Sequence, residues 1–167
     1  GSFGSGSGAH LAAELFKLET GTDIVHVPYK GGGPAITALL GREVQLVFSS
    51  MLPVLPHVQG GKLKAIGLAA AKRSPAAPDV PTFREAGISY ETGTWFGMLV
   101  PSGTPAHIVE LLHRETAQIL RGEDIRQRIT REGAEPVGNT PRQFATFVQQ
   151  EAARWARVVE AAKMKVD

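Results

Sequence analysis

The sequence predicts an α/β fold in which a mainly parallel sheet is covered by helices on both faces. Short apolar segments of strand length alternate with segments of helical periodicity between Leu11 and Ala70. Glycine-rich or serine-containing turns follow the apolar segments. This alternation is typical of parallel sheets, in which ligands bind beyond the carboxyl ends of the strands.

Composition narrows the classes of function. The chain has 167 residues and is 43% hydrophobic, which is enough to bury a core. Its 18 basic and 16 acidic residues form no basic stripe, so we expect no nucleic-acid partner. It has no cysteine for disulfides or thiolate chemistry. No apolar run approaches the roughly 20 residues that cross a bilayer. No signal peptide is seen, so we expect a cytosolic chain, a mature one, or one lacking its natural start.

The most informative stretch is a predicted strand, Ile24 to Val27, that Pro28 ends before a glycine-rich turn and a helix over Pro34 to Leu40. A helix N-terminus carries roughly half a positive charge, and Lys30 adds a full one. The turn contains three consecutive glycines, Gly31, Gly32 and Gly33. Because glycine has no side chain, a ligand can approach the backbone closely there. The stretch therefore predicts an anion site. The alternative is that these residues form only a tight turn between the strand and the helix, with the Lys30 side chain in solvent.

A similar arrangement opens the chain. The Gly/Ser run from Gly1 to Gly8 resembles a flexible linker or tag, but apolar residues at helical spacing follow it over His10 to Leu18. Ser5 and Ser7 would then lie at a helix N-terminus and supply hydroxyl groups. This predicts a second anion site, and the alternative is a disordered tag with an ordinary N-cap at Ser7.

A third strand end carries a serine pair. Val44 to Phe48 is a predicted strand that ends in Ser49 and Ser50, and a helix is predicted over Met51 to Gln59. A further strand is predicted over Leu63 to Ala70. The carboxyl ends of parallel strands meet at one edge of a sheet, so these serines should lie near the glycine turn.

The remaining chain predicts a change of architecture. Lys72 to Thr82 reads as a surface loop, and a short helix is expected over Phe83 to Ala86. Tyr90 to Val100 is long for one strand, and its two glycines suggest bends, so it could pass between two lobes.

Helices dominate the last third of the sequence. Thr104 as N-cap and Pro105 as first residue should begin a helix to Leu120. The same signal at Thr140 and Pro141 should begin a helix to about Ala162. Between them we expect a helix over 123–131 and a very short strand over 135–137.

No catalytic motif is recognisable. His10 and Glu14 stand one helical turn apart, but two ligands do not make a metal site. His26 lies in the middle of a predicted strand, where a structural histidine is expected more often than a base. The sequence therefore predicts recognition by backbone and hydroxyl groups, with no enzymatic activity, no cofactor and no metal.

Several motifs together resemble one family over nearly the whole chain. Gly4-Ser5-Gly6-Ser7 with His10-Leu11, and Val27-Pro28-Tyr29-Lys30-Gly31 with Pro34-Ala35, are similar to its two signatures. Others follow in the expected order: Lys72-Arg73-Ser74-Pro75, Pro78-Asp79-Val80-Pro81, Trp95-Phe96-Gly97 and Gly133-Ala134-Glu135-Pro136. The family is the Bug/TctC group of extracytoplasmic solute-binding proteins of tripartite tricarboxylate transporters.

This resemblance implies a type II periplasmic-binding-protein-like fold with two lobes. Residues 1–94 would form lobe 2, a three-layer α/β lobe, and residues 95–167 would be the hinge strand and returning helices of lobe 1. The rest of lobe 1 is then absent from the sequence. Without it, the apolar helix faces predict association of two copies of the chain.

The resemblance also implies the function. It implies a periplasmic protein that holds a small carboxylate between its lobes and delivers it to membrane transporter subunits. The alternative is a ligand-sensing protein that signals to a partner. For Lys30 we expect a contribution to the loop or its field, and for the glycine backbone a ligand contact. The candidate ligand-binding residues are Ser5, Gly6, Ser7, His10, Tyr29, Lys30, Gly31, Gly32, Gly33, Ser49 and Ser50.

Overall fold

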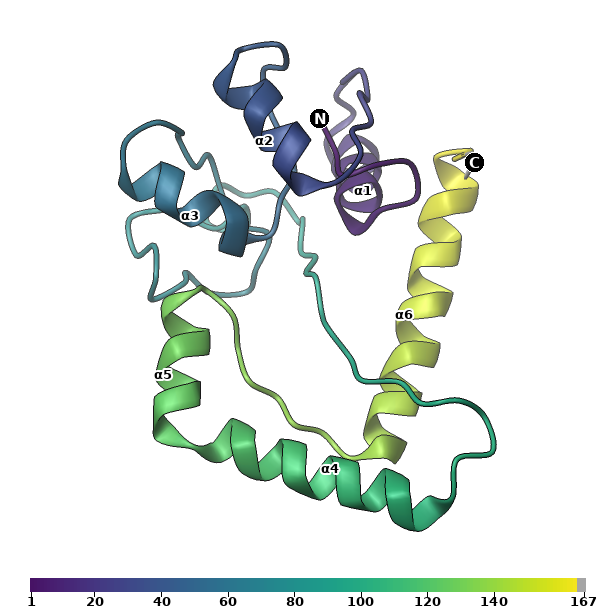
Figure 1. Ribbon diagram of the computed structural model, residues 1–167. Coiled ribbons are helices and arrows are strands. Elements are labelled where there is room, and N and C mark those ends of the chain that lie inside the picture. The colour runs from purple at the N-terminus through teal and green to yellow at the C-terminus, as the bar shows by residue number, and fades with distance from the viewer. Residues whose placement is uncertain (165–167) are drawn as a thin grey trace.

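The computed structural model describes residues 1–164, in which two groups of helices are connected by long extended segments. The first group comprises α1 (Gly8–Thr20), α2 (Gly32–Leu40) and α3 (Met51–Gln59), which lie together at one end of the molecule (Figure 1). The second group comprises α4 (Ala106–Arg121), α5 (Glu123–Arg131) and α6 (Pro141–Ala161). It forms an open frame in which α4 and α5 lie away from the first group, while α6 extends back to lie beside α1 (Figure 1).

The predicted strands form no continuous ladder among residues 1–164, where the pairing consists of isolated bridges. Ser2 pairs with Pro28 and Leu68 pairs with Thr82, both in parallel orientation. The parallel direction is the predicted one, whereas the expected continuous ladders are not formed. Proline contributes to this difference, because Pro28 and the residue before Thr82, Pro81, have no N–H with which to extend a ladder.

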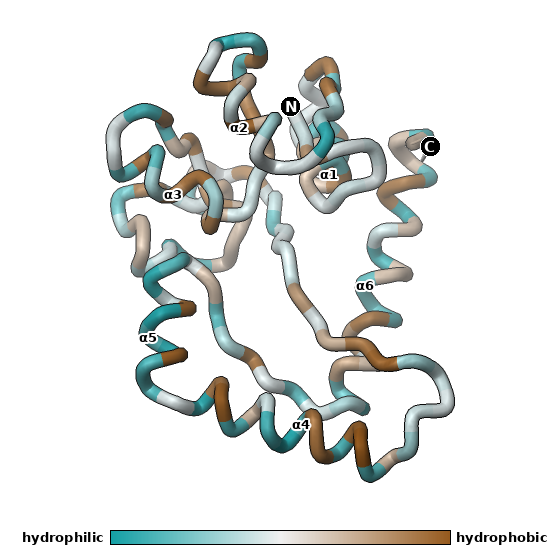
Figure 2. Tube along the Cα trace, in the orientation of Figure 1, coloured by the Kyte–Doolittle hydropathy of each residue, from teal (hydrophilic) through white to brown (hydrophobic). Residues whose placement is uncertain are grey.

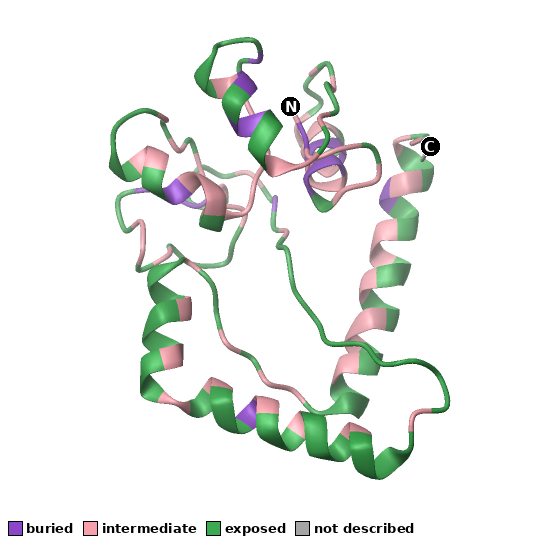
Figure 3. Ribbon diagram, in the orientation of Figure 1, coloured by how far each residue is buried: buried purple, intermediate pink, exposed green. Residues whose placement is uncertain are grey.

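An aromatic cluster forms the core of the first group. It brings together the rings of Phe16, Phe48, Phe83 and Tyr90, with centroid separations from 5.1 to 6.5 Å. Tyr90 is only 3% exposed. The buried residues of the first group gather on its helices, whereas the frame is mostly exposed (Figure 3). The core that positions the glycine loops is therefore built within residues 1–94.

Helix starts agree with the sequence in part. Thr140 caps α6, Pro141 is its first residue, and Gln143 completes a capping box, as predicted. The cap expected at Thr104 is wrong, because its Oγ1 donates backward to the carbonyl oxygen of Pro101 at 2.8 Å and Pro105 is the N-cap. The short helix expected over residues 83–86 is a turn.

The extended segment from residue 93 to 100 connects the two groups (Figure 1). Trp95 packs edge-on against Phe144 and Phe147 of α6, with ring centroids 5.6 and 5.4 Å apart. About two turns further along α6, Arg154 donates a hydrogen bond to the carbonyl oxygen of Glu91. These contacts tie α6 to the beginning of the connecting segment.

Several large apolar side chains remain exposed on the frame, and the hydropathy colouring shows apolar positions along α4 (Figure 2). On this helix they are Ile108, Leu111, Leu112 and Ile119. Within the described residues, no helix is both long and apolar enough to cross a membrane.

Candidate functional site

The first glycine loop ends in a capped helix. Ser7 is the N-cap of α1, and its Oγ accepts a hydrogen bond from the N–H of His10 at 3.2 Å. The same hydroxyl donates to the carbonyl oxygen of Gly4 at 2.7 Å. The Ser7 side chain is thus occupied within the loop, whereas Ser5 is exposed. Of the two predicted hydroxyl groups, the one on Ser5 is free to meet a ligand.

The second glycine loop begins α2 without a side-chain cap. Its N-cap, Gly31, has φ of 104°, a conformation that residues with a Cβ rarely adopt. Within the described residues, the N–H groups of Gly32 and Gly33 have no hydrogen-bond acceptor. Helix α2 therefore presents two free N–H groups at its positive end, as an anion site requires.

The two loops are joined to each other. The N–H of Gly31 donates to the carbonyl oxygen of Phe3 at 3.1 Å. The Phe3 ring packs on Gly32, where an added Cβ would lie 3.4 Å from the ring. The parallel pairing of Ser2 with Pro28 sets this register. The structure thus brings the first two predicted sites together, at the carboxyl ends of two neighbouring segments.

The other predicted residues occupy more varied places. Lys30 is exposed. The Tyr29 ring lies beside Gly1, where an added Cβ would be 3.3 Å from it. Ser50 is the N-cap of α3 without a side-chain cap bond, and the Ser49 hydroxyl donates to the Ser50 carbonyl oxygen at 2.8 Å. Ser49 thus has its hydroxyl proton engaged locally.

His10 and His26 form a pair that no pattern in the sequence predicted. Their rings stack with centroids 3.7 Å apart and planes 7° apart. His10 is 7% exposed, so it lies beneath the first loop. Burial lowers the pKa of both imidazoles, and the facing His10 ring lowers the pKa of His26 further. The spacing of 16 positions offers no sequence signal for this contact.

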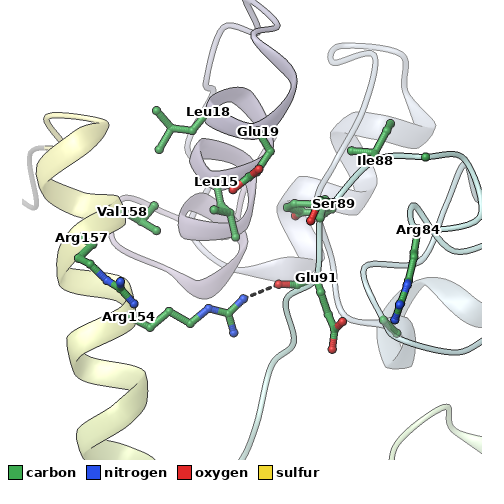
Figure 4. A pocket seen from close by; sticks show the side chains of 13 residues that line it. Leu15, Leu18, Glu19, Arg84, Ile88, Ser89, Glu91, Arg154, Arg157 and Val158 are labelled. Atoms are coloured by element: carbon green, nitrogen blue, oxygen red, sulfur yellow. Dashed lines mark hydrogen bonds between the residues drawn. The ribbon is translucent and has the colours of Figure 1, made fainter.

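A cavity lies away from the glycine loops. It has a volume of about 740 Å³ and opens between α1, α6 and the segment from Arg84 to Glu91 (Figure 4). The Arg154 side chain, which lines the cavity, extends to the backbone carbonyl oxygen of Glu91 and donates a hydrogen bond to it (Figure 4). None of the predicted site residues lines this cavity. Within residues 1–164, no three metal-ligating side chains come together.

The sequence and the fold both match a known family. Residues 1–164 match the family model described as the tripartite tricarboxylate transporter family receptor, and the chain belongs to this family. Its members are periplasmic solute-binding proteins of α/β fold. The chain spans about half the length of the relatives described next.

Individual relatives agree with this assignment. The chain is 40% identical to protein BugT of Bordetella pertussis over 163 residues, which is 96% of this chain and 50% of BugT. It is 36% identical to R. palustris Rpa4515, solved with adipate, with a TM-score of 0.89 over 95% of this chain and 54% of that one. It is 36% identical to MatC of Rhodopseudomonas palustris with bound malate, with a TM-score of 0.77 over 90% and 53%.

Proposed function

We propose that this chain supplies one wall of the binding site of a periplasmic receptor for a small carboxylate, and that it recognises the ligand without chemical conversion. The hydrogen bond from Gly31 to Phe3 carries this proposal, because it sets the N-termini of α1 and α2 side by side. A carboxylate would accept from the N–H groups of Gly32 and Gly33 and from the Ser5 hydroxyl, in the field of Lys30.

The division of the chain follows the same logic. Residues 1–94 form lobe 2 in this proposal, and residues 95–164 form the hinge segment and returning helices of lobe 1; residues 165–167 lie outside the described part. Adipate and malate in two relatives support a dicarboxylate class of ligand. Transporter subunits in the membrane would receive it.

One wall alone should bind weakly. A helix N-terminus stabilises an anion by up to about 2 kcal/mol in favourable geometry, so two termini give at most about 4 kcal/mol. This corresponds to a Kd on the order of 1 mM. A receptor of full family length would add the contacts of the opposite lobe and exclude water.

Amide chemical shifts test the proposal. Adipate added to the ¹⁵N-labelled chain should shift the amide resonances of Ser5, Gly32 and Gly33, with half-saturation at millimolar concentration. Hexane-1,6-diol, which has the same length without charge, is the control ligand and should leave them unchanged. Unmoved loop amides in excess adipate, or equal shifts with the diol, would refute the proposal.

A paired substitution at Gly33 sharpens this test. Gly33 is exposed, and apart from its chain neighbours and the backbone of its own helix an added Cβ there meets no atom within 4 Å. Both substitutions add a Cβ directly before Pro34, so a cost to the fold should be shared by the two variants. Gly33→Asp places a carboxylate at the helix N-terminus and should abolish the adipate response. Gly33→Asn is nearly isosteric but neutral and should retain it. An equal response in both variants would place the anion elsewhere.

We further propose that the exposed apolar positions of α4 would face the rest of lobe 1 in a receptor of full family length, and that in this chain alone they meet a second copy. Exposed patches of this kind favour association. Light scattering should give a dimer mass that falls to the monomer mass in Leu111→Glu. A monomer mass at high protein concentration would exclude the dimer.

A further inference from the structure

The stacked histidines lie directly beneath the first glycine loop, and each is connected to it. The N–H of Gly6 donates to Nδ1 of His10 at 3.1 Å. Nε2 of His26 lies 2.6 Å from the hydroxyl oxygen of Ser2, which is fully buried. That oxygen also accepts from the N–H of Gly4 at 3.3 Å. Two positions of the loop are therefore held from one imidazole stack.

The bond from Gly6 fixes the tautomer of His10. An N–H donor requires an unprotonated Nδ1, so the ring proton lies on Nε2. Nε2 is 3.8 Å from Oε1 of Glu14, which is beyond hydrogen-bond distance. Protonation of Nδ1 would set two N–H groups against each other and break the bond to the loop. Only the neutral ring can hold Gly6.

The charged surroundings do little to favour an imidazolium. The carboxylate of Glu14 is paired with the ammonium of Lys17 at 3.0 Å, which offsets its attraction for a second cation. On the stacked ring of His26, the charge of His10 and the amino group of Gly1 both oppose added positive charge. Burial has the largest effect on His10 and lowers its pKa, so the ring is neutral at pH 7.

We infer that His10 is a positioning residue: its neutral ring, stacked on His26, holds the loop that opens α1 through the Gly6 N–H. For its consequence on ligand binding this inference rests on the proposed function, whereas the loop itself can be measured without ligand. Acidification below the ordinary histidine pKa of 6.5 should loosen the loop. His10 then acts on a ligand through the loop and does not touch it.

Amide hydrogen exchange of Gly6 in the ligand-free chain tests whether His10 holds the loop. The exchange rate is expressed as a protection factor, so that the intrinsic exchange rate cancels. His10→Phe keeps a ring for the stack but has no acceptor. It should lower Gly6 protection roughly two- to tenfold, the worth of one hydrogen bond. His10→Asn places an amide oxygen near the Nδ1 position and should restore protection. Unchanged protection in His10→Phe, with the fold intact by circular dichroism, would overturn the inference.

The pH profile gives a second and independent readout. In the unsubstituted chain, the protection factor of the Gly6 amide should decline as the His10 ring becomes protonated. The ¹⁵N chemical shifts of the ring monitor this protonation. In His10→Asn the protection should not change over that range. A Gly6 protection factor that stays constant while the His10 ring titrates would contradict the inference.

The adipate response separates this inference from the proposed function. Taken as the ratio of the unsubstituted chain to His10→Asn, it cancels protonation of adipate itself. If His10 positions the loop, this ratio should decrease as the pH is lowered. An increase of the ratio as the pH is lowered would show that His10 contacts the ligand. If adipate shifts no amide in either protein, the proposed function fails while the Gly6 exchange result still decides the role of His10.

Discussion

Tyr90 donates a hydrogen bond from its phenolic oxygen to the carbonyl oxygen of Ala12, 2.9 Å away and 78 positions earlier in the chain. This contact fastens the segment that leaves the first group of helices to the middle of α1. Burial raises the pKa of the Tyr90 phenol well above its ordinary value, so the hydroxyl remains a donor at all physiological pH values.

Tyr90→Phe should destabilise the chain by about 0.5–1.5 kcal/mol, because it removes one buried hydrogen bond and leaves the aromatic packing in place. The midpoint of urea denaturation measures this change. Tyr29→Phe is the matched control, since the Tyr29 hydroxyl makes no hydrogen bond within the described residues. Equal effects of the two substitutions would show that the Tyr90 bond contributes nothing specific.

Gly97→Ala should destabilise the contact between the connecting segment and α6 by about 1–3 kcal/mol, as overpacking does. A Cβ at this position would lie 2.8 Å from Cε1 of Phe144, whose ring packs on Trp95. Tryptophan fluorescence during urea unfolding reports the change. Gly93→Ala has open space around the new methyl group and should be nearly neutral.

Thr140→Ala should cost about 0.5–2 kcal/mol, since it removes the capping box at the start of α6. Thr104→Ala is the control for a threonine of similar sequence context that does not cap α4. Its substitution should change the thermal unfolding midpoint far less. A larger loss at Thr104 than at Thr140 would contradict this view of the two helix starts.

The carboxyl group of Glu85 should titrate near pH 2. The hydrogen bonds from Arg73 and from the Thr82 N–H lower its pKa to about 2. A depressed carboxyl pKa stabilises the folded state above the ordinary value of 4.5, and this contribution is lost as the pH falls from 4.5 towards 2. NMR titration of the Glu85 carboxyl carbon measures it, and Arg73→Ala should raise the midpoint towards 4.5.

The boundaries of several helices could be predicted because their signals are local. Met51–Gln59 and Glu123–Arg131 are helices over the expected residues, and the Thr140 cap forms as predicted. Thr104 shows the limit of such signals, because a cap and a backward turn need the same residues. The hydroxyl takes whichever partner the chain path brings near, and here that is Pro101.

The candidate site could be predicted only in outline. Glycine turns before helices mark the loops around Gly6 and Gly32, and the backbone geometry that they require is visible in the residue types. The residue types did not indicate the role of each side chain. Ser7 uses its hydroxyl to close its own loop, and His10 lies buried against His26, so neither is presented as a free contact.

The sequence by itself determined the family motifs, the helices, and the glycine loops that open α1 and α2, since these depend on residues within a few positions of each other. Only the tertiary structure decided that Gly31 bonds to Phe3, that His10 stacks on His26, and that Tyr90 reaches Ala12. Such contacts form where separate segments meet in space, and no local pattern of residue types encodes which partner a segment will find.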